Sequence, residues 1–109
     1  MGIRQSIVVT VQRKQGKILA DKRLYGNAAV CFENSGDSDL QCTSEACLLA
    51  TEAAELLTND KDIPTALKKF EEAAKKFEVT AEFENAARCF YSARNYSHAA
   101  RYYCHTFYL

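Results

Sequence analysis

The sequence predicts an all-α protein that is built from paired helices. Its 109 residues suit a single domain with a modest core. Sixteen alanines stand beside only four glycines and one proline. Alanine is the strongest intrinsic helix former, and so few glycines and prolines provide too few turn residues for a β-fold with many turns. A third observation is a spacing of residue types that occurs three times, which indicates a helical repeat.

The repeated spacing marks the second helix of each predicted pair. A large residue is followed by alanine three positions on and by an aromatic residue four further. The copies are Tyr25-x-x-Ala28-x-x-x-Phe32, Ile63-x-x-Ala66-x-x-x-Phe70 and Tyr96-x-x-Ala99-x-x-x-Tyr103. They begin at residues 25, 63 and 96, at intervals of 38 and 33 residues. Because this spacing places all three side chains on one helical face, each copy predicts the start of a helix.

A partner helix precedes each copy. Nine positions upstream stands a small residue, with an apolar residue three further on: Gly16 and Leu19, Ala54 and Leu57, Ala87 and Phe90. A small residue lets a neighbouring helix approach closely, and the aromatic residue opposite fills the remaining space. The pattern therefore predicts three helix pairs: 11–22 with 25–35, 43–58 with 63–77, and 80–94 with 96–108.

Polar segments and caps fit these boundaries. Residues 35–39 read Ser-Gly-Asp-Ser-Asp, and residues 59–62 read Asn-Asp-Lys-Asp. Pro64 suits a first helical turn, where its missing N–H is not needed. Residues 1–10 lie outside the pairs, and the β-branched stretch 7–11 predicts an extended or disordered tail before a helical repeat domain over 11–109.

This register resembles the tetratricopeptide repeat (TPR), a helix–turn–helix unit of about 34 residues. In the third pair the family offsets fall on Phe83, Ala86, Ala87, Phe90, Ala99, Tyr103 and Thr106. In the second pair they fall on Ala50, Ala53, Ala54, Leu57, Ala66, Phe70 and Ala73. The first pair fits only in its second half, and no pair has the family's opening Trp or closing Pro. The resemblance implies antiparallel hairpins over 11–35, 43–77 and 80–108, stacked as a right-handed superhelix.

A narrower resemblance covers residues 12–108. Two stretches of the chain carry it, namely Gly16-x-x-Leu19-x-x-Lys22-x-x-Tyr25-x-x-Ala28-x-x-Cys31-Phe32-Glu33 and Phe83-x-x-Ala86-Ala87-x-Cys89-Phe90. They are similar to the helical-repeat region that follows the motor in UvrD-like helicases of the TPR-and-ankyrin-repeat type. It implies a segment of a larger, helicase-like protein. The phosphate-loop motif G-x-x-x-x-G-K-[ST] does not occur in this sequence, so we expect no ATP hydrolysis by this chain itself.

The net charge of zero is a sum of unequal blocks. Residues 1–24 carry six bases and one acid, residues 25–60 carry seven acids and no base, and residues 61–109 carry eight bases and six acids. A net charge of zero argues against a protein whose overall electrostatic field attracts nucleic acid or anionic lipid. A nucleic-acid contact through the basic first block of a helicase-associated segment is a weaker hypothesis, because the block lacks aromatic stacking residues.

No residue pattern predicts an enzyme, a cofactor or a metal site. His98 and His105 lie seven residues apart on one predicted helix, about 10 Å along its axis, which is too far for joint chemistry. The five cysteines are odd in number, include no C-x-x-C pair and follow no signal peptide. They predict an intracellular, cytoplasmic or nuclear protein. Three of them, Cys31, Cys89 and Cys104, are expected to pack as small hydrophobes.

The expected function is therefore protein–protein interaction. By the TPR resemblance, solvent-facing positions on the first helices would contact a protein or peptide partner: Thr51, Glu55, Glu84, Arg88 and Tyr91. The aromatic C-terminus has no polar helix to cover it, and three residues are predicted to form an exposed interface there: Tyr102, Phe107 and Tyr108. Either the array continues in a longer polypeptide or this end meets a partner or a second copy.

An alternative function follows from the first residues. Met1-Gly2-Ile3-Arg4-Gln5-Ser6 fits the pattern for N-myristoylation at Gly2. A single acyl chain needs a second signal for stable anchoring, and the basic residues of the first block would supply it. The sequence thus leaves open a small, membrane-tethered adaptor.

Overall fold

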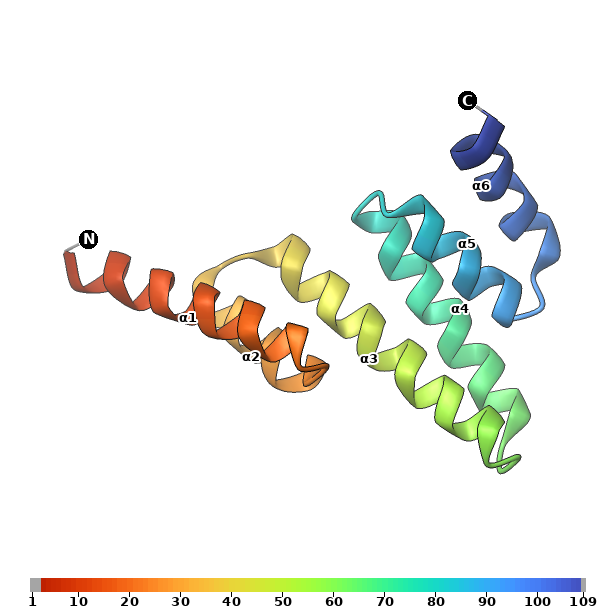
Figure 1. Ribbon diagram of the computed structural model, residues 1–109, viewed down its shortest axis with the longest axis horizontal. Coiled ribbons are helices and arrows are strands. Elements are labelled where there is room, and N and C mark those ends of the chain that lie inside the picture. The colour runs from red at the N-terminus through yellow and green to blue at the C-terminus, as the bar shows by residue number, and fades with distance from the viewer. Residues whose placement is uncertain (1–2, 109) are drawn as a thin grey trace. The chain divides into compact units, whose positions relative to one another are not determined.

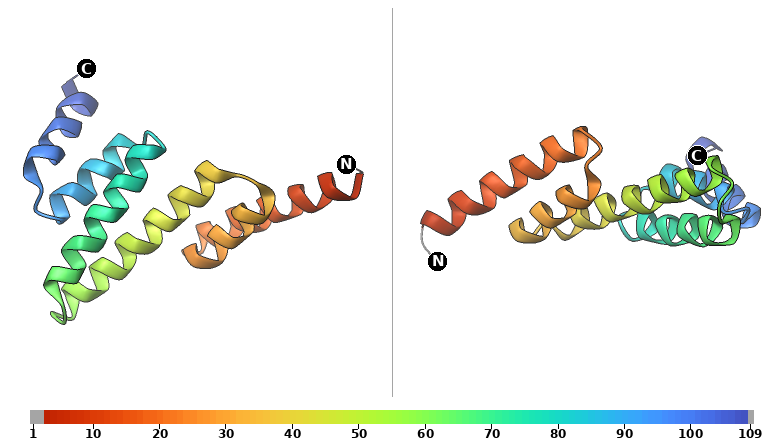
Figure 2. Two further views of the ribbon diagram at one scale, coloured as in Figure 1. Left: turned by 180° about the vertical axis from the view of Figure 1, so that it is seen from behind. Right: turned by 90° about the horizontal axis from the view of Figure 1, so that it is seen from below.

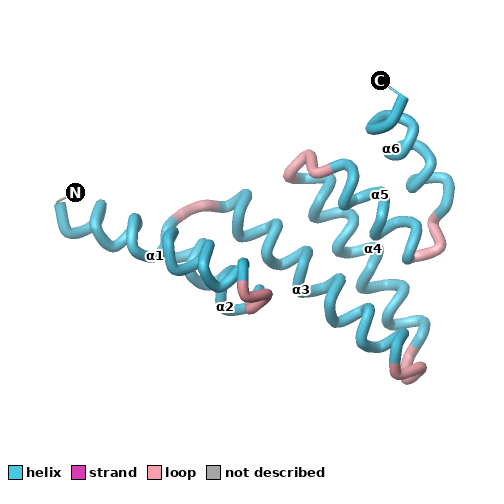
Figure 3. The backbone as a smooth tube through the Cα atoms, in the orientation of Figure 1, coloured by secondary structure: helices cyan, strands magenta, loops and turns pink. Residues whose placement is uncertain are grey.

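The computed structural model describes the backbone of residues 3–108 and the side chains of residues 7–104. The described backbone folds into six α-helices and contains no strand (Figures 1 and 3). The helices are α1 (Ile3–Asp21), α2 (Tyr25–Ser35), α3 (Ser38–Thr58), α4 (Ile63–Val79), α5 (Phe83–Ser92) and α6 (Tyr96–Tyr108). The predicted all-α class is confirmed. The second helices also begin where the repeated spacing placed them, at residues 25, 63 and 96.

The prediction of an extended or disordered tail over residues 1–10 was wrong for the described part of that segment. Residues 7–11 lie inside α1, which begins at Ile3. β-branched residues cost only a few tenths of a kcal/mol each in a helix, relative to the best formers. Neither glycine nor proline interrupts residues 3–15, and the helix continues through Gly16 to Asp21. α3 likewise begins at Ser38, five residues earlier than the predicted 43.

All five turns between helices close in the same way. Each contains one residue with positive φ, namely Arg23, Gly36, Asp60, Ala81 and Arg94. The N–H of the next residue donates to the carbonyl five positions back, as from Leu24 to Leu19 and from Asn95 to Phe90, both at 2.9 Å. This is the Schellman arrangement, which satisfies the last carbonyls of a helix. The shared turn is compatible with a helical repeat.

The chain divides into two compact units, and the division falls inside α3. The N-terminal unit comprises residues 1–45 and the C-terminal unit residues 46–109. In the N-terminal unit α1 packs against α2. A Cβ added at Gly16 would lie 2.7 Å from Cε1 of Phe32, whose side chain is only 2% exposed. The predicted contact between a small residue and an aromatic residue is confirmed for this pair.

An ion pair also ties the two helices of the N-terminal unit together. The Arg13 guanidinium on α1 donates to both carboxylate oxygens of Asp37, at 2.8 and 3.1 Å. The Ser35 hydroxyl donates to the same carboxylate at 2.6 Å. These bonds hold the pKa of Asp37 below its ordinary value, with the Arg13 bond as the largest cause. The turn that follows α2 is thereby fastened to the side of α1.

The C-terminal unit has a core of alanines and aromatic rings. The larger cluster joins α3, α4, α5 and α6 through the buried residues Ala46, Ala73, Ala74, Phe77, Ala86, Cys89, Phe90 and Ala99. A smaller cluster joins α3 to α4 through Ala53, Ala66 and Phe70. Alanine on one helix lets the next helix approach, and the rings fill the space between them. None of the helices in the described part of the chain is both long enough and apolar enough to cross a bilayer.

One predicted contact falls a residue away from its expected place. The spacing predicted Ala54 as the small residue of the second pair, but Ala54 is exposed and Ala53 is fully buried. The turn between α3 and α4 has four residues, 59–62, whereas the turns 22–24 and 93–95 have three. The extra residue shifts the register of α3 by one position relative to Ala66 on α4, so Ala53 takes the contact.

Candidate partner-binding surface

The five residues predicted to contact a partner all have exposed side chains. Thr51 and Glu55 lie on α3, whereas Glu84, Arg88 and Tyr91 lie on α5. The Thr51 hydroxyl donates to the Cys47 carbonyl at 2.8 Å, which satisfies it within its own helix. The sequence therefore predicted their exposure correctly, and their role in binding stays a prediction.

Two charged residues of this set pair with each other. The Arg88 guanidinium donates to the Glu84 carboxylate at 2.9 Å, one helical turn away. Both side chains are at least half exposed, so solvent screens the pair and it adds at most a few tenths of a kcal/mol to stability. The pair mainly fixes the direction of the guanidinium on the surface of α5.

An aromatic residue that the partner-site prediction omitted joins Tyr91. Tyr91 in the last turn of α5 and Tyr96 at the start of α6 are 59% and 57% exposed. Their ring centroids are 5.3 Å apart and the rings meet edge to face at 68°. The sequence analysis assigned Tyr96 only to the helix-start pattern. The short turn 93–95 was the available signal, because it brings the end of α5 beside the start of α6.

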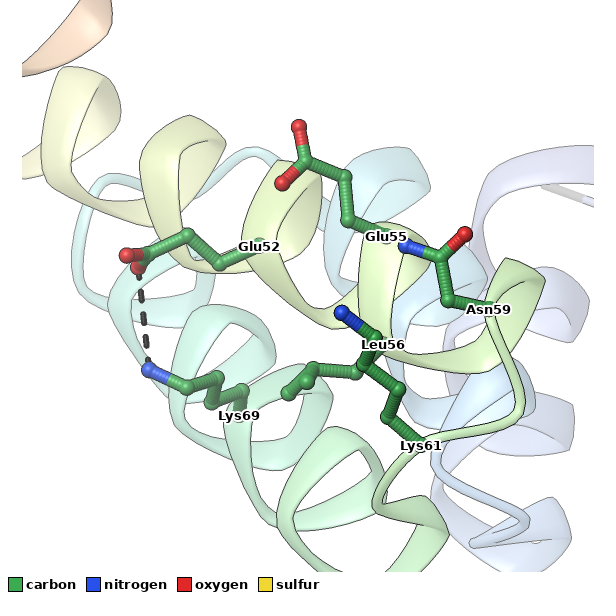
Figure 4. Close-up of a pocket in the computed structure, with 6 residues that line it drawn as sticks. All are labelled: Glu52, Glu55, Leu56, Asn59, Lys61 and Lys69. Carbon is green, nitrogen blue, oxygen red and sulfur yellow. Dashed lines mark ion pairs between the residues drawn. The ribbon is translucent and has the colours of Figure 1, made fainter.

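A shallow hollow lies between α3 and α4. It encloses about 300 Å³. Figure 4 shows its lining residues, which are Glu52, Glu55, Leu56, Asn59, Lys61 and Lys69. Lys69 forms an ion pair across it with Glu52 at 3.7 Å, and the Lys61 side chain extends from the turn towards α3. Of the predicted partner residues, only Glu55 lies at this hollow, whose lining combines two acids, two bases and one amide.

The C-terminal interface prediction needs one correction. Tyr102 is half-buried rather than exposed, because its ring stacks on Phe83 at 5.4 Å and on Phe90 at 6.0 Å between ring centroids. Its hydroxyl donates to the Glu78 carboxylate, and this bond raises the pKa of Tyr102. Tyr102 thus connects α4, α5 and α6 inside the C-terminal unit. The side chains of Phe107 and Tyr108 lie outside the described residues.

The remaining candidate residues are placed as follows. Cys89 is buried, and burial raises the pKa of its thiol to about 11, so it is an unreactive core residue. Cys31 is half-buried, but Cys104 is exposed, contrary to the prediction that it packs. The His98 ring lies against the Phe90 ring, with centroids 4.9 Å apart and a tilt of 34°. Its Nδ1 lies 3.0 Å from the Asn95 side-chain oxygen. Gly2, the predicted acylation site, lies outside the described residues.

Comparison of the chain with models of protein families, with curated proteins and with solved structures found no match. The class of protein that the structure defines is thus an all-α chain whose adjacent helices pack against each other through small and aromatic residues.

Proposed function

We propose that this chain is a non-catalytic protein–protein interaction module of the TPR-like type. The observation that carries the proposal is the exposed pair of Tyr91 and Tyr96, held edge to face beside the Arg88 side of α5. Tyrosine and arginine are the residues most often found to dominate binding energy at interfaces. Rings that are already fixed in one arrangement lose little conformational entropy when a partner covers them.

The repeated architecture supports the finer part of this proposal. Five Schellman turns of one kind join the helices, and small residues face aromatic residues in the hairpins, as Gly16 faces Phe32. A TPR-like array of about three repeats uses these contacts and presents its first helices to a partner. The wider proposal, from the sequence resemblance, is that the array is a segment of a larger protein such as a UvrD-like helicase.

Site-specific photocrosslinking in cells of the source organism tests the function. A photoreactive phenylalanine at position 91 should trap a discrete partner protein, because this position would lie inside the interface. The matched control is the same photoreactive residue at Val79, which is apolar, 76% exposed and on α4 of the same unit. Arg88→Glu combined with the probe at position 91 should abolish the product. Identical products from positions 91 and 79, or a product that Arg88→Glu leaves unchanged, would contradict the proposal.

A further inference from the structure

The turn between α5 and α6 brings two tyrosines and two arginines together in the C-terminal unit. Tyr91 and Tyr96 meet edge to face beside it, and both side chains are more than half exposed. Arg94 is an exposed residue of the turn itself, and its N–H donates to the Tyr91 carbonyl at 3.0 Å. Arg88 precedes Tyr91 by three positions, so the two residues lie on one side of α5, about 60° apart. We name these four residues the turn patch.

The backbone of the turn patch is held on both sides of the turn. α5 and α6 pack against each other, and the left view of Figure 2 shows the turn that joins them at one end of the hairpin. The Asn95 N–H donates to the Phe90 carbonyl at 2.9 Å, which closes α5. The Asn95 side-chain oxygen accepts from the Ser97 hydroxyl at 3.3 Å at the start of α6. A partner therefore meets a preformed surface, and less conformational entropy is lost on binding.

The charges around the two rings favour an anionic partner. Residues 85–104 contain three arginines and no acid. Arg88 donates to Glu84 at 2.9 Å, but both side chains are at least half exposed, so this pair is weak. A partner carboxylate that the rings shield from water would bond more strongly to the same guanidinium. A cationic partner would be repelled by Arg88 and Arg94.

We propose that the turn patch binds a short segment of a partner protein that is rich in Asp and Glu. This inference rests on the proposed function and names the chemistry of its partner. Carboxylates of the segment pair with Arg88 and Arg94, because a planar guanidinium group donates to both oxygens of a carboxylate. The rings of Tyr91 and Tyr96 cover the apolar parts of the segment, and their hydroxyl groups donate to its backbone carbonyls.

Single-stranded nucleic acid suits the turn patch less well. Aromatic rings and basic residues also form the binding sites for such strands, but those sites are basic grooves that follow the backbone over at least about four nucleotides. Residues 46–109 carry nine acids and eight bases, so the unit as a whole does not supply the excess of positive charge that a strand requires. Two guanidinium groups are enough for a short acidic segment.

Titration of the full chain with short peptides, followed by NMR of the backbone amides and the arginine Nε–H groups, tests this chemistry. The probe is a capped peptide of glutamates with one leucine, and its neutral counterpart has glutamine in place of each glutamate. The acidic peptide should shift the signals of residues 88–97 and bind at least about tenfold more tightly than the neutral one. High salt should weaken the binding of the acidic peptide alone.

Matched charge reversals test the site. Arg94→Glu should weaken the binding of the acidic peptide by about tenfold. Arg101→Glu is the control, because Arg101 is also exposed on this hairpin but lies about 140° around α6 from Tyr96. It should weaken the binding by less than about twofold, because solvent and salt screen a distant charge. Circular dichroism checks that each variant keeps its helix content, and Arg94→Gln replaces Arg94→Glu if the latter does not fold.

Removal of an acid tests the competition for Arg88. Glu84→Gln should strengthen the binding of the acidic peptide by about twofold, because it removes the carboxylate that already accepts from Arg88. The control is Glu72→Gln, because Glu72 is an exposed acid on α4 of the same unit. It should change the binding less than Glu84→Gln does.

Several results would overturn the proposal. Equal binding of the acidic and neutral peptides excludes the recognition of carboxylates. Equal losses from Arg94→Glu and Arg101→Glu exclude the turn patch as the site. A thymidine oligonucleotide that binds more tightly than the acidic peptide and shifts the same signals would assign the turn patch to single-stranded nucleic acid.

Photocrosslinking at position 91 separates this inference from the proposed function. Mass spectrometry of the trapped product identifies the partner segment, which should contain acidic residues beside the crosslinked position. A trapped segment that is neutral or basic overturns the acidic partner but leaves the interaction module in place. Failure to trap any partner overturns the proposed function and this inference with it.

Discussion

The two units of this chain use one hairpin spacing but build very different interiors. The N-terminal unit relies on one ring, Phe32, which sits in the notch left by Gly16, and on the ion pair between Arg13 and Asp37. The C-terminal unit has three buried phenylalanines that interleave with alanines from four helices. Eleven large hydrophobic side chains are exposed among the described residues, and seven of them belong to the N-terminal unit: Ile7, Val8, Val11, Ile18, Leu24, Val30 and Leu40.

This difference separates what a repeat spacing specifies from what it leaves free. Where the turn has three residues, as between α1 and α2, the spacing specifies which residues meet across the hairpin, because it fixes the side of each helix that faces the other. It does not specify how much apolar surface the hairpin can bury. The C-terminal unit buries three phenylalanine rings within itself, whereas the N-terminal unit leaves most of its large apolar side chains exposed.

The largest expected effect comes from a substitution in the core of the C-terminal unit. Phe90→Ala should lower the free energy of unfolding by about 3–5 kcal/mol, because Phe90 is 2% exposed and its loss leaves a cavity beneath Ala99 and Tyr102. That is a large fraction of the stability of a small domain. Urea denaturation followed by circular dichroism measures the change.

Val79→Ala is the control for this variant, because Val79 is apolar but 76% exposed on the same unit. It should change stability by less than about 0.5 kcal/mol. Equal losses from Phe90→Ala and Val79→Ala would mean that Phe90 does not support the core as the structure describes.

The next effect tests the glycine notch of the N-terminal unit. Gly16→Ala should destabilise this unit by about 1–3 kcal/mol, because the new methyl group would meet the Phe32 ring at 2.7 Å. The gain of up to about 1 kcal/mol in helix propensity offsets only part of the loss. Hydrogen exchange of amides in α1 and α2 measures it, and amides of α5 and α6 provide the internal reference.

Two variants make this test specific. Gln15→Ala changes an exposed neighbour in the same helix and should leave exchange nearly unchanged. Gly16→Ala combined with Phe32→Leu should recover part of the loss, since leucine is smaller than phenylalanine. Faster exchange in the double variant than in Gly16→Ala would show that crowding by the ring is not the cause.

The sequence predicted the fold class and the starts of α2, α4 and α6, because the interior spacing of each second helix is strictly local. It predicted Ala54 instead of Ala53 as the contact residue of α3, because the turn 59–62 has one extra residue. That residue changes which side of α3 faces α4, and a fixed spacing along the chain does not include such a change. It misjudged Tyr102, because a stack of three rings depends on how α5 and α6 meet. It did not predict that residues 7–11 are helical, because this β-branched run suggested extended chain.

A reciprocal exchange of turn residues sharpens the comparison between the units. Gly36 and Ala81 occupy equivalent positive-φ positions in the turns after α2 and after α4. Gly36→Ala should cost about 1 kcal/mol, and the cost is conformational because a Cβ there would meet no atom within 4 Å. Ala81→Gly should stabilise by a similar or smaller amount, because glycine is the preferred residue at this position. Thermal unfolding measures both, and changes of the same sign would contradict a common turn geometry.

The smallest effects concern pH and salt, and they distinguish Asp37 from Asp62, the two carboxyl groups whose pKa is lowered. The pKa of Asp37 is lowered mainly by its bond to Arg13, and the pKa of Asp62 by bonds from Thr65 at the start of α4. A carboxyl group with a lowered folded pKa stabilises above its unfolded pKa, about 3.9 for Asp, and loses that contribution as pH falls through the folded value. The melting temperature of the wild type should therefore approach that of Asp37→Asn, and equally that of Asp62→Asn, as the pH falls below 4.

High salt at pH 7 distinguishes the two groups. It should reduce the melting-temperature difference between the wild type and Asp37→Asn more than that between the wild type and Asp62→Asn, because salt screens an ion pair more than a hydrogen-bonded cap. Equal sensitivity to salt would mean that Arg13 does not hold Asp37 by its charge.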